Sequence, residues 1–321
     1  MMLKEINLDK TYQILLILLA FFMQLTVSGG NAIIVLISFI WLLSGNYKKK
    51  FFNVISSKVI QASLIFYCIH LLGIFWTEDL EWGLHILHKM WYFLLFFPIL
   101  FDIVKKEYVK YYISSFLLAI SLTEVVSYLI WFELIEPFKN ASVGNPTPFM
   151  SHITYNPVLA FAIYLVVHEI FFNKDLTRFS FFMYSFFAIT MSINMFITGG
   201  RAGQVMYFAA LIILIFQFFD NQKTKALFLI LLLLPSIFFI AYSLSPLFEG
   251  RVDLAFINAY EYFSENQLNS SVGRRITFAI NSWTVFIGNP FLGVGTGDFP
   301  MAYREVNSFV SPDQPYATNP H

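Results

Sequence analysis

The amino-acid sequence predicts an all-α protein, a bundle of helices that crosses a membrane many times. Charged residues make up 12% of the chain, which is about half of the share found in soluble domains. Hydrophobic residues make up 58%, and the mean hydropathy is +0.66. The apolar residues gather mostly in runs of about 16 to 25, the length that a helix needs to cross the hydrocarbon core of a bilayer. These three observations exclude a soluble globular domain.

Nine apolar runs predict nine membrane-spanning helices. A signal peptide is the alternative interpretation of the first run. That run lacks a convincing A-x-A cleavage site, and a second run follows at once, so we favour an uncleaved helix. The four residues 28–31, Ser-Gly-Gly-Asn, predict a tight hairpin turn between the first two helices. The predicted spans are residues 12–27, 32–44, 59–76, 82–104, 108–132, 157–172, 179–198, 202–219 and 226–243.

The basic residues predict the orientation of this bundle. If the N-terminus is cytoplasmic, thirteen of the twenty Lys and Arg residues lie inside and six lie outside, while Lys89 stays within the fourth helix. This bias follows the positive-inside rule. The outer six are arginines apart from Lys139, whereas the inner set is almost entirely lysine. Arginine binds phosphate in a bidentate manner, so the outer arginines are candidates for a functional role.

Two long loops, residues 133–156 and 244–321, lie outside in this topology. The second contains a long polar segment, residues 270–321, and a large irregular segment outside a membrane bundle is commonly functional. Within it, apolar residues recur at helical spacing between Arg275 and Ile287 and predict a short amphipathic helix, which Gly288, Asn289 and Pro290 end.

These features divide the chain into two predicted parts. Residues 1–150 hold the first five helices and the first outer loop. Residues 151–321 hold helices six to nine and the large loop, residues 244–321. The last residues resemble the approach to another helix, so we expect further membrane helices to follow them.

Three of the outer arginines are candidates for binding an anion. Arg201 lies in the segment TGGRAGQ between two predicted helices, and its two neighbouring glycines allow a ligand to approach the backbone closely. The alternative is an interfacial arginine that reaches the lipid headgroups. Arg274 and Arg275 begin the amphipathic helix. The helix dipole disfavours a cation there, which mildly favours a bound anion.

Other polar residues allow several interpretations. His85, His88 and Lys89 share one face of the fourth helix, where Lys89 either pairs with the acidic residues between 78 and 81 or contacts an anionic ligand. A metal is the third interpretation, although neither a carboxylate nor a cysteine completes a ligand set. Glu124 lies within a span, where a carboxyl is either functional or neutral. The other histidines, including His152, fit hydrogen-bonded packing residues.

Two further signals are weak. The glycines of residues 293–297 suggest a phosphate-binding loop, but the Lys-Ser/Thr pair and the strand–turn–helix setting of such loops are missing. The net charge of zero gives no reason to expect a nucleic-acid partner. Cys68, the one cysteine, lies in an apolar run and fits a small core residue.

Taken together, four segments resemble the O-antigen ligase family. They are TGGRAG at residues 198–203, SVGRR at 271–275, NPFLGVGTGDF at 289–299 and NPH at 319–321. The segment SHITYNP at 151–157 also fits. The resemblance covers roughly residues 151–321, while the N-terminal helices agree with the family only in topology.

The resemblance implies a membrane glycosyltransferase with a GT-C-like helical fold in the bacterial inner membrane. Its donor would be a glycan on undecaprenyl diphosphate, and its acceptor lipid A–core at the periplasmic face. The reaction would be a direct, inverting displacement that needs neither a nucleotide sugar nor a metal. By motif, Arg201 and Arg275 match the arginines assigned to the diphosphate, and His321 matches the proposed base. Arg274 and Lys89 are further candidates for the diphosphate.

Three other functions remain open from the sequence. A polymerase of O-antigen or capsule would use the same donor with a lipid-linked glycan as acceptor. A protein-directed oligosaccharyltransferase is the second alternative. A transporter is the third, but transporters commonly show repeats and broken helices at the midplane of the membrane, whereas polarity here gathers at one face.

Overall fold

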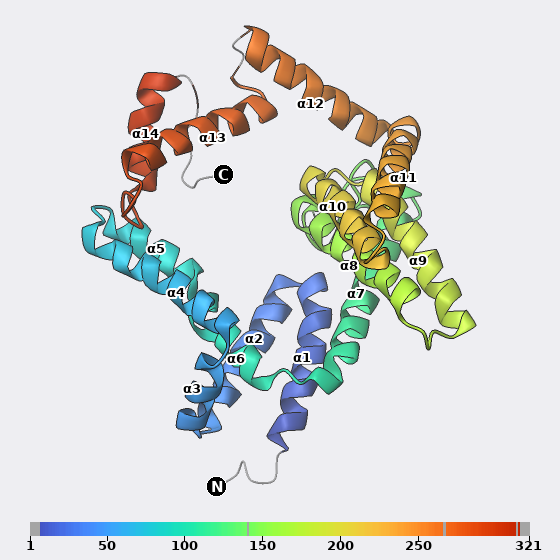
Figure 1. Ribbon diagram of the computed structural model, residues 1–321, viewed down its shortest axis with the longest axis horizontal. Coiled ribbons are helices and arrows are strands. Elements are labelled where there is room, and N and C mark those ends of the chain that lie inside the picture. Colours follow the sequence, from blue (N-terminus) through green and yellow to red (C-terminus); the bar gives the residue numbers. More distant parts are fainter. Residues whose placement is uncertain (1–6, 140, 266–267, 313, 315–321) are drawn as a thin grey trace. The chain divides into compact units, whose positions relative to one another are not determined.

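The computed structural model describes residues 7–139, 141–265, 268–312 and 314. Helices dominate this part of the chain, and one isolated bridge, between Ser142 and Asn145, is its only β pairing. The predicted all-α fold class is therefore confirmed. Figure 1 traces the helices, which are α1 Leu8–Leu25, α2 Val27–Leu43, α3 Tyr47–Ile55, α4 Lys58–Gly73, α5 Leu80–Lys89, α6 Phe97–Ile103, α7 Val109–Trp131, α8 His152–Phe172, α9 Arg178–Ile197, α10 Arg201–Phe218, α11 Lys223–Leu244, α12 Pro246–Glu265, α13 Ser271–Gly288 and α14 Phe299–Val310.

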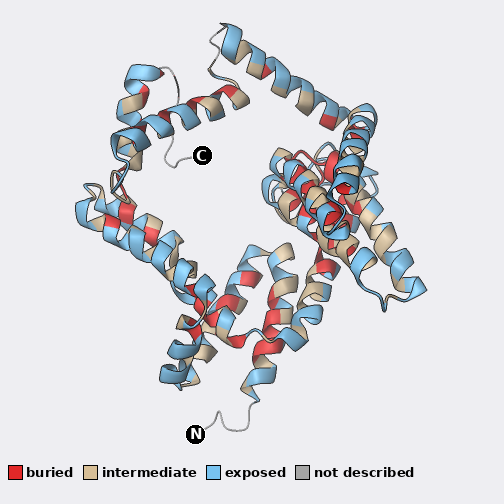
Figure 2. Cartoon of the chain, in the orientation of Figure 1, coloured by how far each residue is buried: buried red, intermediate tan, exposed pale blue. Residues whose placement is uncertain are grey.

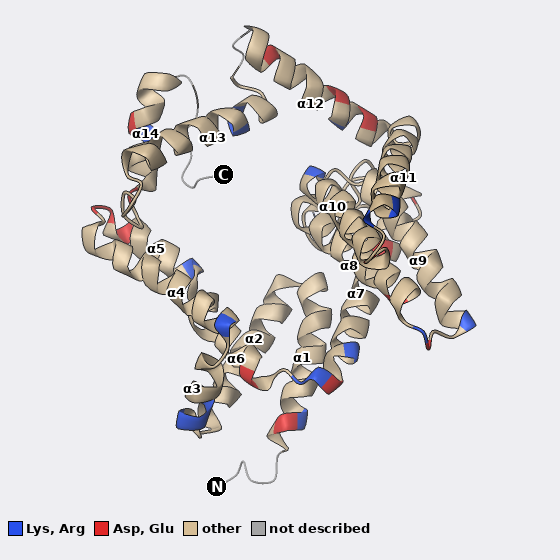
Figure 3. Ribbon diagram, viewed as in Figure 1, with Lys and Arg blue, Asp and Glu red and all other residues tan. Residues whose placement is uncertain are grey.

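Shorter helical segments extend two of these helices. The turn η2, Ile74–Trp76, continues α4, and the π-helical segment η3, Tyr92–Phe96, joins α5 to α6. A third segment, η4, Lys106–Tyr108, precedes α7. Charged residues are sparse and lie mainly near helix ends and in the connecting loops (Figure 3). Such a distribution is expected where the middle of each helix faces hydrocarbon.

In the described residues, eight helices are long and apolar enough to cross a membrane, or nine if a bent pair counts as one span. The pair is α2 and α3, which meet at 120°. Gly45 and Asn46 form this bend with positive φ angles of 69° and 56°. The left-handed conformation is cheap for glycine and tolerable for asparagine, which explains why the bend occurs there. A polytopic bundle is confirmed, with the second span shorter than the others.

The predicted turn at residues 28–31 is wrong. Helix α2 already begins at Val27, so both glycines lie in its first turns. A Cβ atom on Gly30 would lie 2.9 Å from Cγ of Met23, and one on Gly29 would lie 2.7 Å from Cγ2 of Thr26. Each of these side chains is near the glycine in sequence. The two glycines therefore relieve crowding at the junction of α1 and α2.

The chain forms two compact units. One unit, here called the second unit, comprises Gln13–Val35 and Lys105–Asp253. Its core lies where α8 packs against α9 and α10, with α7 against both α8 and α9. Figure 2 shows buried residues gathered in this group of helices. Fully buried members of the core are Tyr155, Leu159, Ala162, Met191 and Met195.

The other unit, here called the first unit, comprises Met1–Tyr12, Leu36–Val104 and Leu254–His321. Its helices α3, α4 and α6 pack together, and α13 packs against α14. Trp41 and Asn53 fix the end of α6, because Nε1 of Trp41 donates to Asp102 at 2.8 Å and Nδ2 of Asn53 donates to it at 2.9 Å.

The segment after residue 244 is more regular than the sequence indicates. Three helices, α12, α13 and α14, occupy most of its described part, whereas we had expected an irregular loop with short helices. The amphipathic helix is present as α13 and ends at Gly288 as predicted. Two polar residues of this helix, Thr277 and Asn281, are buried. A hydropathy profile therefore underestimates how well ordered the segment is.

Candidate functional site

Arg201 is the first residue of α10, and a short turn of Thr198, Gly199 and Gly200 leads into it. Hydrogen bonds from both sides hold this turn. Oγ1 of Thr198 donates to Oδ1 of Asn156 on α8 at 2.9 Å. Nδ2 of Asn156 in turn donates to the carbonyl of Gly200 at 3.4 Å. Buried amides of this kind are strongly constrained, because leaving one unpaired is costly. They fix where α10 begins.

Gln204, one turn further along α10, closes the same network. Its Nε2 lies 3.3 Å from the carbonyls of both Met195 and Thr198 and donates to them. On the far side of α8, Oη of Tyr155 donates to Oδ1 of Asn194 at 2.9 Å. Gln204 of the TGGRAGQ motif and Tyr155 and Asn156 of SHITYNP therefore belong to one buried polar network that joins α8, α9 and α10.

The glycines of the TGGRAG motif serve helix packing. A Cβ atom on Gly203 would lie 2.2 Å from Cβ of Asn156, and one on Gly200 would lie 2.5 Å from the carbonyl oxygen of His152. The backbones of α8 and α10 therefore touch at these two positions. We had expected the glycines beside Arg201 to favour ligand approach. The space beside Gly200 and Gly203 is instead filled by α8.

A second basic residue accompanies the start of α10. Nη2 of Arg251, on α12, lies 3.4 Å from where a Cβ atom of Gly199 would be. The sequence singled out Arg251 only as one of the outer basic residues, because fifty residues separate it from Arg201. The first turn of α10 contains no acidic residue. The helix dipole and two arginines thus make this helix start electropositive.

Asn145 connects the same turn to a histidine. The N–H of Gly199 donates to Oδ1 of Asn145 at 3.0 Å, which fixes the orientation of the amide. Its Nδ2 then faces Nδ1 of His152 at 2.8 Å and donates to it. Nδ1 is therefore the acceptor, and the ring proton lies on Nε2. His152 acts here as a hydrogen-bonded residue of the turn, and Asn145 is a residue that sequence reasoning missed.

Arg274 and Arg275 lie in the first unit, where the first turn of α13 passes into the second. Both side chains are exposed. Ser270 caps the helix, since the N–H of Gly273 donates to its Oγ at 2.9 Å. The cap holds the two arginines on a regular helix start. Arg201 belongs to the second unit, so no single unit contains both arginines that the family resemblance assigns to the diphosphate.

The glycine-rich segment, residues 293–298, docks onto the end of α4 and the start of α5. Oγ1 of Thr296 donates to the carbonyl of His70 at 2.6 Å. The carboxylate of Asp298 accepts the backbone N–H groups of Glu78, at 2.9 Å, and Asp79, at 2.8 Å. These contacts join residues about 220 positions apart. The two backbone N–H groups before α5 are therefore already paired with an anionic group, the carboxylate of Asp298.

The glycines of this segment explain its tight fit. Gly295 adopts a φ of +103°, which only glycine reaches without strain. A Cβ atom on Gly297 would lie 2.1 Å from the carbonyl oxygen of Asp79 and 2.8 Å from the nitrogen of Gly83. The sequence signal GVGTG thus marks a close contact between two segments of the first unit.

Lys89 is exposed at the last residue of α5. Its Nζ lies 5.9 Å from the ring centroid of Trp82, a weak cation–π contact at most. Trp82 also packs against the ring of His85, with centroids 5.0 Å apart. No group of three or more His, Cys, Asp or Glu side chains in the described residues could hold a metal ion. Lys89 remains a candidate for contact with an anion, and its positive charge is the feature that supports this role.

The other predicted residues are buried, exposed or outside the described part of the chain. Glu124 is buried in α7 and lines a small pocket of about 170 Å³ with Tyr128 and Thr190. Cys68 is exposed on α4, so the prediction of a core residue is wrong. His321, the predicted base, lies outside the described residues.

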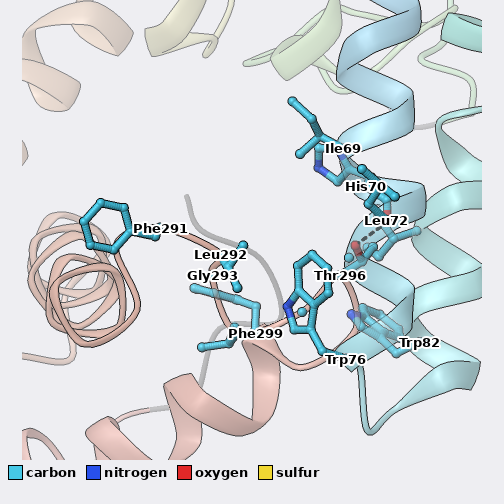
Figure 4. Close-up of a pocket in the computed structure, with 14 residues that line it drawn as sticks. Ile69, His70, Leu72, Trp76, Trp82, Phe291, Leu292, Gly293, Thr296 and Phe299 are labelled. Carbon is cyan, nitrogen blue, oxygen red and sulfur yellow. Dashed lines mark hydrogen bonds between the residues drawn. The ribbon is translucent and has the colours of Figure 1, made fainter.

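The described residues of each unit line a large apolar pocket. In the first unit, α4, α5 and the docked segment enclose about 590 Å³. Figure 4 shows Trp76, Leu292 and Thr296 around it, with Phe291 extending away from α4. In the second unit, α7 to α11 line about 560 Å³ beside the last turn of α9, which leads directly into the turn before Arg201. This groove contains Ser192, Phe196, Tyr207, Ile240 and Ser245 among its residues.

Comparisons with known proteins agree with the resemblance. A family model described as O-antigen ligase matches residues 186–321. The match begins within α9, so it includes TGGRAG, SVGRR, NPFLGVGTGDF and NPH but leaves out SHITYNP. No curated protein and no solved structure matches the chain. Residues 186–321 are therefore similar to the O-antigen ligase family.

Proposed function

We propose that this protein transfers a glycan from undecaprenyl diphosphate to the lipid A–core acceptor at the periplasmic face of the inner membrane. One observation carries the proposal beyond the family match. The start of α10 is a rigid, electropositive helix N-terminus, with Arg201 as its first residue and Arg251 beside Gly199. Such a site suits a diphosphate, because backbone dipoles and guanidinium groups both stabilise negative charge.

The reaction mainly requires stabilisation of a leaving group. The bond between the anomeric carbon and the phosphate oxygen breaks, and undecaprenyl diphosphate leaves with the electron pair. The acceptor hydroxyl attacks from the opposite face, so the configuration inverts, and its proton passes to a base. Positive groups fixed in advance near the diphosphate lower the barrier as its charge grows. We assign this role to Arg201 and Arg275, with Arg251, Arg274 and Lys89 as further contacts.

His321 is the proposed base. The assignment rests on the position of the family's histidine after Asn319 and Pro320. A neutral imidazole is suited to accept a proton from a sugar hydroxyl at neutral pH. His152 is less suited, because its Nδ1 already accepts a hydrogen bond from Asn145 and the turn before α10 depends on that contact.

The apolar groove of the second unit suits the prenyl chain of the donor. It begins at Phe196 and Ile197, two residues before Gly199, and continues between α9, α10 and α11. A diphosphate at the start of α10 would therefore have an apolar channel directly beside it. Replacing Ile193, which is 49% exposed in the groove, by Trp should fill this space. We expect a higher KM for the donor with little change in kcat.

A deletion strain tests the proposed reaction. Loss of a ligase leaves lipid A–core without O-chains, whereas loss of a polymerase leaves core that carries one repeat unit. Plasmid-borne wild-type protein should restore the long chains, and the Arg201→Ala and Arg275→Ala variants should not. Arg201→Lys should rescue poorly, because lysine lacks the bidentate geometry. Core with a single repeat unit would instead assign the chain to the polymerases.

A matched arginine serves as the control for nonspecific effects of losing a positive charge. Arg178 is the first residue of α9, as Arg201 is of α10, but the topology places it on the opposite membrane face. Arg178→Ala should complement fully. Each lost charge-assisted contact should cost roughly 1.5–3 kcal/mol. Near-normal transfer by both Arg201→Ala and Arg275→Ala would refute the diphosphate assignment.

Cysteine labelling tests the orientation on which the proposal depends. In a Cys68→Ser background, Ser271→Cys should react with an impermeant maleimide added to intact spheroplasts, and Asn221→Cys should react only after lysis. Both residues are exposed. The reverse pattern would place the start of α13 in the cytoplasm and remove the periplasmic acceptor from consideration.

A further inference from the structure

Helix α13 buries two polar residues, Thr277 and Asn281, near its middle. Gly273, Thr277, Asn281 and Val285 form the buried face, which packs against α14. Nδ2 of Asn281 lies within hydrogen-bond distance of three acceptors on and after α14, at 3.2 Å from Oη of Tyr303, 3.1 Å from Oδ1 of Asn307 and 3.0 Å from Oγ of Ser311. The contact between the two helices is therefore a polar seam.

The opposite side of α13 is apolar and exposed. Ile280, Trp283 and Ile287 recur at i, i+3 and i+7 and are 48%, 62% and 59% exposed. The stripe continues past the end of the helix in Phe291, which is 97% exposed, and Leu292. A helix pair in water would place these residues inside and the asparagines outside. The arrangement here is the reverse of that, as expected for a helix whose outer surroundings are hydrocarbon.

Other contacts locate this stripe relative to a membrane. Helix α4 with η2, Lys58–Trp76, is a candidate membrane span. The segment after α13 is bound to its last turn, because Thr296 donates through Oγ1 to His70 and through its N–H to Gly73. Trp76, at the end of the span, is partly exposed, as are the aromatic residues that mark membrane–water boundaries. The C-terminal end of α13 is thus tied to the point where α4 leaves the bilayer.

We propose that α13 is an interfacial helix, which lies along the membrane surface at the Trp76 end of α4 and inserts the stripe of Ile280, Trp283 and Ile287 into the lipid. Phe291 and Leu292 extend the inserted edge. The polar seam with α14 faces away from the bilayer and carries the rest of the segment. Helices of this kind bury an apolar face at the boundary of headgroups and acyl chains. The inference concerns anchoring and is independent of the proposed donor and acceptor.

The interfacial position has a consequence for Arg275. This residue is exposed one turn before the stripe begins, at the start of the same helix. An inserted α13 holds its first turn at the depth of the lipid phosphates. Arg275 would then meet any diphosphate that a membrane-bound lipid carries at its headgroup, without the chain having to leave the bilayer.

Nitroxide labels test the insertion in the full chain. The protein is reconstituted into vesicles of phosphatidylethanolamine and phosphatidylglycerol, in a Cys68→Ser background, with one label at Ile280→Cys, Trp283→Cys or Ile287→Cys. Matched controls are Glu305→Cys and Ser308→Cys, exposed positions on α14. Power saturation compares the access of oxygen, which concentrates in lipid, with the access of a water-soluble nickel chelate.

Insertion predicts an oxygen-to-nickel access ratio several-fold higher at the stripe than at the α14 controls. Equal ratios at both sets would overturn the proposal, since the stripe would then face water. Labels at the stripe that are protected from both reagents would also overturn it, because the stripe would then face protein, such as a second copy of the chain. Each labelled variant must keep the melting temperature of the Cys68→Ser parent, which separates a true negative from misfolding.

Discussion

The starts of α10 and α5 each lie against a glycine-rich segment, residues 198–203 and 293–297, and have opposite electrostatic character. At α10, the turn before the helix approaches Arg251, Arg201 follows, and the first turn has no acidic residue. At α5, Asp79 caps the helix through the N–H of Trp82, Glu81 lies in the first turn, and Asp298 accepts two further N–H groups. An anion is favoured at α10 and is already supplied by the protein at α5.

This difference shows what a glycine-rich motif does and does not indicate. In both places a Cβ atom would collide with a neighbouring backbone, so the glycines record close packing. Whether a helix start binds a ligand depends on the charges that surround it. Those charges come from segments distant in sequence, Arg251 for α10 and Asp298 for α5.

The largest expected effect tests whether the α10 glycines serve packing. Gly203→Leu should prevent folding of the second unit, because even a Cβ atom would lie 2.2 Å from Cβ of Asn156 and 2.3 Å from its carbonyl carbon. We expect no monodisperse protein by size-exclusion chromatography in detergent. Gly250→Ala is the control, since nothing lies within 4 Å of its Cβ position. A folded, stable Gly203→Leu protein would show that the glycine is kept for another reason.

Continuous apolar runs predicted most of the membrane-spanning helices, because a bilayer demands about 20 consecutive apolar residues whatever their neighbours. This signal failed where neighbours decide. Gly29 and Gly30 continue a helix that turn rules would break. Asn281 of α13 donates to Asn307 of α14 inside a contact that hydropathy predicts to be exposed. Asn145 and Arg251 were not recognised, because only the fold brings them to the turn before Arg201.

The second prediction concerns the chemistry assigned to the first unit. His321→Ala should lower the transfer rate about 10²–10⁴-fold while donor binding persists, as expected for loss of a general base. The wild-type rate should fall as the pH drops below the range in which histidine is neutral. Steady-state transfer to purified acceptor and equilibrium donor binding measure the two effects. An unchanged rate and pH profile in the variant would assign the proton to another group.

The third prediction sharpens the description of the α10 start. Arg251→Ala should reduce transfer by roughly one order of magnitude, because a single charge-assisted contact contributes about 1.5–3 kcal/mol. This loss should be smaller than the loss caused by Arg201→Ala. The donor KM should rise more than kcat falls if Arg251 binds the diphosphate mainly in the ground state. Arg304→Ala, a change of the same type on α14, serves as the control. Equal activity of Arg251→Ala and wild type would limit the electropositive site to Arg201 and the helix dipole.

The smallest expected effect tests the acidic start of α5. Asp298→Asn keeps the shape of the side chain but replaces a carboxylate with an amide, which accepts the N–H groups of Glu78 and Asp79 through only one oxygen. The loss should be about 1–3 kcal/mol of local stability, since charge-assisted bonds to backbone donors exceed neutral ones by that order. Hydrogen exchange at Glu78 and Asp79 should become faster while exchange in α8 and α10 stays unchanged. Asp253→Asn is the matched control, because its carboxylate accepts a hydrogen bond from Tyr242 in the second unit. Should Asp298→Asn instead acquire affinity for inorganic phosphate, the α5 start would be a latent anion site that Asp298 blocks, and the contrast with α10 would rest on that one side chain.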